Sequence, residues 1–201
     1  MNKVSVREQE RLLRENAVVD AALMLMARTG YSAMHMDAIA AEVGLSKAAL
    51  YRLFPSKEAL VAAALLRLMR RVEDFVREMP ADLSAAEVLR RTLHWALCLR
   101  FTEGWPDVFL VKSDLEPYLH AHTEYMAQVA SLSHLLGSLI ERAKAEGSVD
   151  STLPTTVLVH SLYGRVRDPQ FDSLVRGGTY TPDEMADMLV RLHFGGIKPV
   201  R

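Results

Sequence analysis

The sequence predicts an all-α protein with a small N-terminal helix-turn-helix domain and a larger C-terminal helical domain. Almost every segment of the 201 residues repeats its apolar positions at spacings of three and four, and no segment alternates as a strand would. Glycine, proline and serine residues stand where these periodic segments end. Apolar residues make up 50% of the chain, enough to bury the cores of two unequal domains. We expect the domains to be residues 8–60 and 61–201.

About nine helices are expected, each delimited by its own start or stop signals. The ranges in chain order are residues 8–29, 36–43, 47–53, 56–79, 84–104, a short helix after Pro106, 117–146, one after Thr152 and one from 181.

The first three helices are short or end at glycines. Ala21 and Leu25 lie on one apolar stripe of the first helix, and Gly30 follows as a residue that can close it. Gly44 ends the second helix, and Ser46 is placed to cap the third with its hydroxyl.

The later helices carry clearer signals. Ser56 is placed to cap the long fourth helix, and Pro80 stops it. Residues 84–87, Ser-Ala-Ala-Glu, form a capping box for the fifth helix. Residues 181–184, Thr-Pro-Asp-Glu, combine an N-cap, a proline at the first helical position and an acid at the third. Residues 117–146 are expected to form one uninterrupted helix that ends before a glycine.

Composition excludes several classes of protein. The single cysteine, Cys98, rules out an intrachain disulfide, and no apolar run approaches the length of a membrane span. Residues 1–14 lack the apolar core of a secretory signal, so we expect a cytoplasmic protein with no membrane partner. The net charge is −1, but residues 1–77 carry 12 Lys and Arg against 9 Asp and Glu. This excess gives slight support for a nucleic-acid partner near the N-terminus.

Residues 36–53, MDAIAAEVGLSKAALYRL, have the layout of a helix-turn-helix. Ala40 is small where the two helices would cross, and Gly44 can adopt the positive φ that the turn needs. The second helix of such a unit normally enters the major groove of DNA. Two ordinary core helices around a glycine turn are the alternative interpretation, and the short pattern alone does not exclude it.

The longer pattern over residues 21–60 is more specific. It combines small and apolar positions in the first helix with Gly30-Tyr31, Ile39-Ala40, Gly44-Leu45-Ser46, Leu50-Tyr51, Phe54, Ser56-Lys57-Glu58 and Leu60. Over about residues 10–60 this closely resembles the N-terminal domain of the tetracycline-repressor (TetR) family. The resemblance implies an operator-binding transcriptional regulator whose C-terminal helices bind a small ligand and dimerise.

The expected DNA contacts follow from the outward positions of the motif and from the resemblance. Lys47 and Arg52 can meet phosphates or guanine edges, and the Tyr51 hydroxyl can donate to a phosphate. Lys57, in the first turn of the fourth helix, can reach another phosphate. The full set is His35, Ser46, Lys47, Ala48, Ala49, Tyr51, Arg52 and Lys57.

The chain departs from the family pattern at three places. His35 stands where the family often has a capping Ser or Thr, Ala48-Ala49 replace a common Gly-Thr pair, and Leu53 replaces a frequent His. These changes predict fewer polar contacts from the recognition helix. Residues 1–10 are a candidate flexible arm, in which Lys3 and Arg7 would reach a minor groove, or a tail without a role.

A ring-rich stretch in the C-terminal part is the candidate ligand pocket, with plain core packing as the alternative. Its residues are His94, Trp95, Cys98, Phe101, Trp105, Phe109, Tyr118 and Tyr125. We expect no cofactor and no metal ion, because His120 and His122 are two residues apart and do not share a helix face. Cys98 and His94 are four residues apart, but without a partnering acid in the sequence a core cysteine is the expected interpretation.

The last two helices are the candidate dimer interface, with burial inside one subunit as the alternative. Their apolar residues are Val157, Leu158, Leu162, Val166, Met185, Met188, Leu189, Leu192 and Phe194.

The leading functional hypothesis is a homodimeric repressor that an apolar or aromatic small molecule releases from a pseudo-palindromic operator. A DNA-binding regulator without small-molecule control is the alternative within the same class. An enzyme is disfavoured because no nucleophile–base pair, phosphate loop or metal-ligand spacing stands out. A helical interaction protein with a decayed DNA module is disfavoured because Ser46, Lys47, Tyr51 and Lys57 are retained.

Overall fold

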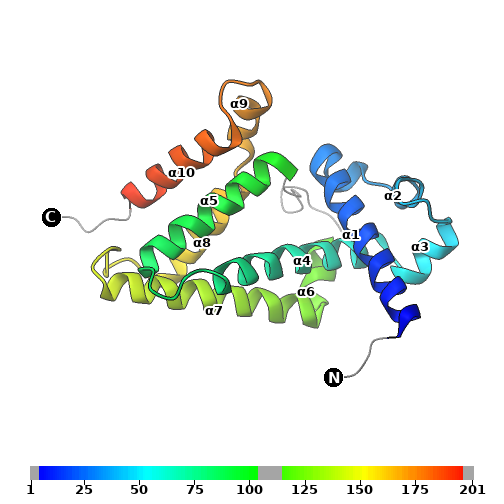
Figure 1. Ribbon diagram of the computed structural model, residues 1–201, viewed down its shortest axis with the longest axis horizontal. Coiled ribbons are helices and arrows are strands. Elements are labelled where there is room, and N and C mark those ends of the chain that lie inside the picture. The colour runs from blue at the N-terminus through cyan, green and yellow to red at the C-terminus, as the bar shows by residue number, and fades with distance from the viewer. Residues whose placement is uncertain (1–4, 104–114, 197–201) are drawn as a thin grey trace. The chain divides into compact units, whose positions relative to one another are not determined.

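The computed structural model describes residues 5–103 and 115–196, and within these ranges the chain is helical and contains no strand (Figure 1). The all-α prediction is therefore confirmed. The elements are α1 (Val6–Ala33), α2 (Met36–Glu42), α3 (Lys47–Leu53), α4 (Lys57–Arg77), α5 (Ala85–Glu103), α6 (Leu115–Ala121), α7 (Thr123–Ala145), α8 (Thr155–Arg167), the 3₁₀ helix η1 (Pro169–Phe171), α9 (Asp172–Arg176) and α10 (Pro182–Gly196).

The described residues divide into two compact units. One comprises residues 5–68 and 115–126, and the other comprises residues 69–103 and 127–196. The first unit therefore contains α6 as well as the helix-turn-helix, whereas the sequence grouped residues 61–201 together. Helix α4 contributes its first twelve residues to one unit and the remainder to the other.

The first unit is built around α1. Val18, Ala22 and Met26 are fully or almost fully buried on one face of this helix. Ala21 of the predicted apolar stripe is buried, whereas Leu25 is only partly buried. Gly30 has a φ of +78° and interrupts the helical backbone, which resumes briefly before Ala33. The guanidinium of Arg67 donates to the Asn16 carbonyl oxygen over 3.1 Å, which ties α4 to α1.

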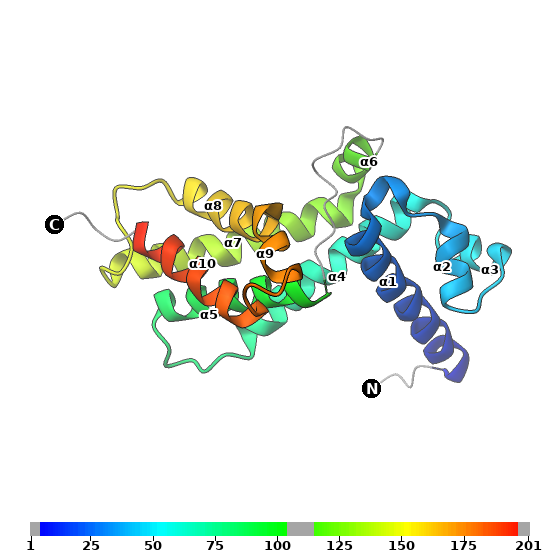
Figure 2. The same cartoon turned by 90° about the horizontal axis from the view of Figure 1, so that it is seen from above.

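The second unit is a helical bundle in which α5 contacts both α8 and α10 (Figure 2). Its core contains Leu97, Ile140 and Leu189, each at most 2% exposed. The almost fully buried Arg100 forms a two-point ion pair with Asp172, with N–O distances of 3.1 and 2.9 Å. This pair joins α5 to α9.

The expected hydroxyl caps are present. At residues 84–87 the Ser84 hydroxyl accepts from the Glu87 N–H over 3.2 Å, while the Glu87 carboxylate accepts from Arg91 over 2.7 Å. The hydroxyl of Ser46 accepts from the Ala49 N–H over 3.2 Å, and that of Ser56 accepts from the Ala59 N–H over 3.1 Å. At the start of α10, Thr181 and Glu184 exchange hydrogen bonds in both directions, which completes the predicted capping box.

Two expectations about helix boundaries were wrong, and two short helices were not foreseen. The single helix over residues 117–146 is interrupted at His122, whose Nδ1 accepts from the Tyr125 N–H over 3.2 Å and so caps α7. The arm expected at residues 1–10 is helical from Val6, because Ser5 caps α1 through the Glu8 N–H. The sequence also missed η1 and α9, and the short helix expected after Pro106 lies outside the described residues.

Candidate DNA-binding interface

The turn between α2 and α3 has the geometry that the motif predicts. Gly44 has a φ of +67°, and the Leu45 N–H donates to the Ala40 carbonyl oxygen over 2.8 Å, which closes the end of α2. Ser46 then starts α3 through its hydroxyl. Backbone hydrogen bonds and one side-chain cap thus define the turn locally.

The inward faces of both short helices are apolar. Ile39 and Leu50 are fully buried, and Ala40 is 4% exposed. Because these residues fill the interior of the first unit, the opposite face of α3 is left to solvent.

The outward face of the motif carries the residues that the sequence proposed for DNA contact. His35, Ser46, Lys47, Ala48, Tyr51 and Arg52 are exposed, and Ala49 and Lys57 are partly buried. The structure therefore presents most of this set to solvent on and beside α3.

Lys47 is already engaged in the free protein. Its Nζ lies 2.9 Å from a carboxylate oxygen of Asp37, and the hydrogen bond and charge of Asp37 raise the lysine pKa. Both side chains are 64% exposed, so the pair is solvated and holds the lysine weakly. A phosphate group would have to compete with Asp37 for this ammonium group.

Lys57 is less free than the sequence suggested. Its ammonium group lies 4.1 Å from the centre of the Tyr31 ring and 3.4 Å from the Ser32 carbonyl oxygen. Partial burial lowers the pKa of Lys57. The hydroxyl of Tyr31 donates to Glu58 over 3.0 Å, so these residues also fasten α4 to the end of α1.

His35 occupies the N-cap position of α2 and makes no side-chain capping hydrogen bond. The departure from a capping Ser or Thr therefore leaves this helix start without the usual side-chain acceptor. The exposed ring of His35 stays available to an incoming phosphate.

The described members of the proposed ligand set are divided between the two units. His94, Trp95, Cys98 and Phe101 lie on α5 in the second unit, while Tyr118 and Tyr125 belong to the first. Trp105 and Phe109 lie outside the described residues. Trp95 stacks on Phe75 with the ring centres 4.6 Å apart, and both side chains are partly buried.

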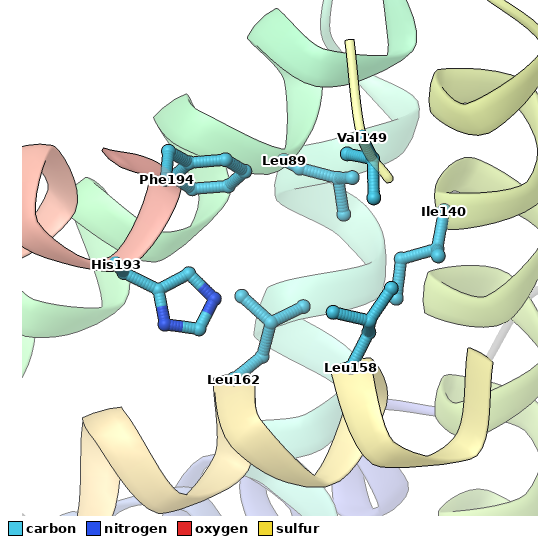
Figure 3. Close-up of a pocket in the computed structure, with 7 residues that line it drawn as sticks. All are labelled: Leu89, Ile140, Val149, Leu158, Leu162, His193 and Phe194. Carbon is cyan, nitrogen blue, oxygen red and sulfur yellow. The ribbon is translucent and has the colours of Figure 1, made fainter. Parts of the chain in front are cut away.

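A small apolar pocket lies elsewhere in the second unit, between α5, α7, α8 and α10 (Figure 3). Its volume is about 10 Å³, which is room for a single water molecule. Typical ligand pockets enclose roughly 300–1,000 Å³, so this one is small. The imidazole of His193 is its polar group. The lining residues are Leu89, Ile140, Val149, Leu158, Leu162, His193 and Phe194.

His193 is 9% exposed, and burial, with a further contribution from the charge of Arg165, lowers its pKa to about 4. The ring is therefore neutral near pH 7. A neutral imidazole offers one donor and one acceptor nitrogen to the pocket.

A glycine turn, two crossed short helices and an exposed second helix define a helix-turn-helix protein. Residues 18–64 match the model of the family described as bacterial regulatory proteins, tetR family. The resemblance predicted for the N-terminal domain is therefore confirmed over these residues.

Two curated relatives are transcriptional repressors named KstR. The chain is 26% identical to KstR of Rhodococcus jostii over 135 residues, which cover 66% of this chain and 60% of that protein. It is 37% identical to KstR of Mycolicibacterium smegmatis over 134 residues, which cover 67% and 64%. The chain thus spans less than two thirds of the length of these relatives.

Solved structures share the fold over almost the whole chain. The fatty acid degradation regulator FadR of Bacillus halodurans superposes with a TM-score of 0.73 at 19% identity, covering 93% of this chain and 97% of its own. FadR of Bacillus subtilis in complex with stearoyl-CoA gives 0.66 at 17% identity, with coverage of 90% and 98%. AibR in complex with isovaleryl coenzyme A and operator DNA gives 0.62 at 22% identity, also with coverage of 90% and 98%.

Within the described ranges, no helix is both long enough and apolar enough to cross a membrane.

Proposed function

We propose that this protein is a sequence-specific transcriptional regulator, a repressor that binds operator DNA as a homodimer and that a small apolar ligand releases. The proposal of DNA binding rests on the exposed face of α3. Lys47, Tyr51 and Arg52 point outward on this face, and Leu50 is buried beneath them. Two of the relatives are named as repressors, which supports repression over activation as the mode of regulation. Bacterial operator DNA lies in the cytoplasm, which is the proposed compartment.

The dimer is proposed to form through α8 and α10. Val157 is 56% exposed and Leu192 is 66% exposed, whereas Leu189 is buried inside the unit. Exposed aliphatic residues on these two helices favour a partner surface there. Dimerisation would pair two recognition helices with the two halves of a pseudo-palindromic site.

The ligand is proposed to enter the second unit at the pocket beside His193. The pocket is too small for a long acyl chain as it stands, so binding requires its helices to separate. Two of the structural neighbours were solved with acyl-CoA thioesters. Acyl-CoA thioesters of graded chain length are therefore the first ligands to test. Regulation without a ligand is the alternative, favoured by the small size of this pocket.

Linkage between ligand and DNA tests the sensor proposal. A ligand shifts an equilibrium only if it binds the DNA-incompetent state more tightly than the competent one. A coupling of about 1–3 kcal/mol would lower operator affinity roughly 5–150-fold, and the operator would weaken ligand binding by the same factor. The experiment titrates each thioester into the free protein and into the protein–operator complex.

Tyr51→Ala is the matched control for this titration, because it lies outside the second unit. The variant should bind the thioester as the wild type does while losing the effect of added operator. Equal ligand affinity with and without operator in the wild-type protein would refute ligand control. The DNA-binding proposal would survive that result.

A further inference from the structure

Three potential metal ligands converge on the surface of the second unit. His94 and Cys98 lie one turn apart on α5, with the Cys98 Sγ 3.7 Å from the His94 Nδ1. Asp183, in the first turn of α10, places a carboxylate oxygen 3.5 Å from the His94 Nε2. One ligand atom from each residue lies within 4.8 Å of the others. The sequence could not pair Asp183 with α5, because 85 residues separate it from Cys98.

Cys98 and Asp183 approach different ring nitrogens of His94, and a single ion would bind only one of these nitrogens. With one atom taken from each residue, the three ligand atoms lie within 4.8 Å of one another. With Zn–S near 2.3 Å and Zn–N and Zn–O near 2.0–2.2 Å, two ligands of a tetrahedral ion lie roughly 3.3–3.7 Å apart. The three donor atoms need to move together by about one ångström to share an ion. His94 and Asp183 are 34% and 84% exposed, so the side chains have room to move and solvent can deliver the ion.

The donor set selects the class of metal. A thiolate and an imidazole favour Zn²⁺ and neighbouring transition ions over Mg²⁺ and Ca²⁺, which prefer oxygen ligands. A deprotonated Cys98 with Asp183 would supply two negative charges, which balance a divalent ion. Three protein ligands leave a fourth position for water or for a group from outside the chain.

The same residues also resemble a reactive Cys–His–Asp chain, but the electrostatics disfavour that interpretation. Burial and the nearby Asp183 carboxylate both raise the pKa of Cys98. A thiol with a raised pKa is a poor nucleophile at neutral pH. A bound cation removes this handicap, because a coordinated thiol loses its proton to the metal.

We propose that His94, Cys98 and Asp183 bind one zinc-class transition metal ion, which links α5 to α10. The site revises the expectation of no metal, which rested on His120 and His122. It is independent of the DNA interface and of the pocket beside His193, since it shares no side chain with either.

Co²⁺ titration of the full chain tests the site directly. A Co²⁺ ion bound through a thiolate gives visible ligand-field bands and a near-ultraviolet charge-transfer band from sulfur to cobalt. We expect both bands at one equivalent of Co²⁺, and Zn²⁺ should bleach them. Absence of the charge-transfer band in the folded wild-type protein would overturn the proposal.

Variants then assign the ligands. Cys98→Ser should abolish the charge-transfer band, and His94→Gln and Asp183→Asn should each weaken Co²⁺ binding at least tenfold. His134→Gln, an exposed histidine on α7, is the matched control and should bind as the wild type does. Circular dichroism checks that each variant folds. Unchanged binding in Asp183→Asn or His94→Gln would show that the three-residue site is wrong.

Discussion

Tyr51 lies on the outward face of α3 with 40% of its surface exposed. Replacing it with alanine should weaken operator binding without unfolding the first unit, because the ring fills no core position. Loss of one hydrogen bond to a phosphate costs about 1–2 kcal/mol, or roughly 5–30-fold in affinity. Fluorescence anisotropy with labelled operator measures the change. Tyr180→Ala, at 38% exposed in the second unit, is the matched control and should bind normally.

His193 makes stability depend on pH. Its folded pKa is about 4, below the usual value of 6.5, so between these pH values the unfolded chain takes up the proton more readily. The contribution of neutral His193 is therefore complete above pH 6.5 and is lost as the pH falls toward 4. Between pH 7 and pH 5 the loss amounts to about 2 kcal/mol.

Urea unfolding at pH 7 and pH 5 measures this loss. His193→Gln should reduce the difference in unfolding free energy between the two pH values, because glutamine does not titrate. His134→Gln removes an exposed histidine and should keep the wild-type pH dependence. An unchanged pH dependence in His193→Gln would contradict the buried neutral imidazole.

At the scale of the elements, the turn between α2 and α3 depends on Gly44. Its φ of +67° is strained for any residue with a Cβ, although a methyl group there would meet no atom within 4 Å. Gly44→Ala should therefore cost about 1–2 kcal/mol from backbone conformation alone. Gly195→Ala, in α10 with the same open space and ordinary φ, should be neutral or slightly stabilising. Thermal unfolding of both variants compares the two effects.

The helix-turn-helix was predictable because its signals are local. Gly44, Ser46 and the apolar positions around them lie within a few residues, and each acts on its own neighbours. The break at His122 was not predictable in this way, because the apolar period continues across it and a histidine is a rare cap. Pro117 suggested a helix start, but α6 begins two residues earlier and holds the proline in its first turn, where no N–H is needed.

The pocket and the metal cluster depend on contacts between distant segments. The pocket joins Leu89 on α5 to Phe194 on α10, and the cluster joins Cys98 to Asp183. Periodicity indicates which face of a helix is apolar, but it does not indicate which other helix covers that face. Sequence reasoning therefore assigned the ring-bearing residues to one pocket, whereas the described ones belong to two units.

For the whole molecule, dimerisation matters because it brings two recognition helices, one from each subunit, to the same operator. Leu192 is 66% exposed on α10, so Leu192→Glu should dissociate the dimer while leaving each subunit folded. Leu189 is unsuitable for this test, because at 1% exposure a charge there would disrupt the core. Leu174→Glu, on the exposed surface of α9, is the matched control.

Sedimentation equilibrium distinguishes the two states. The wild type and Leu174→Glu should have twice the 22.5 kDa mass of the chain, and Leu192→Glu should have the mass of one chain. A wild-type monomer at micromolar concentration would contradict the proposed dimer.

Selection from a pool of random duplex DNA tests sequence-specific operator binding most directly. Fragments retained by the protein are sequenced after several rounds, and the affinity for the enriched site is then measured as the salt concentration rises. We expect a pseudo-palindromic site with half-sites one helical turn apart, roughly 34–36 Å, or a multiple of that distance. Affinity should fall steeply with salt, because phosphate contacts release counterions. A pool that stays random at low salt, with folded dimeric protein, would contradict the assignment of α3 as a recognition helix.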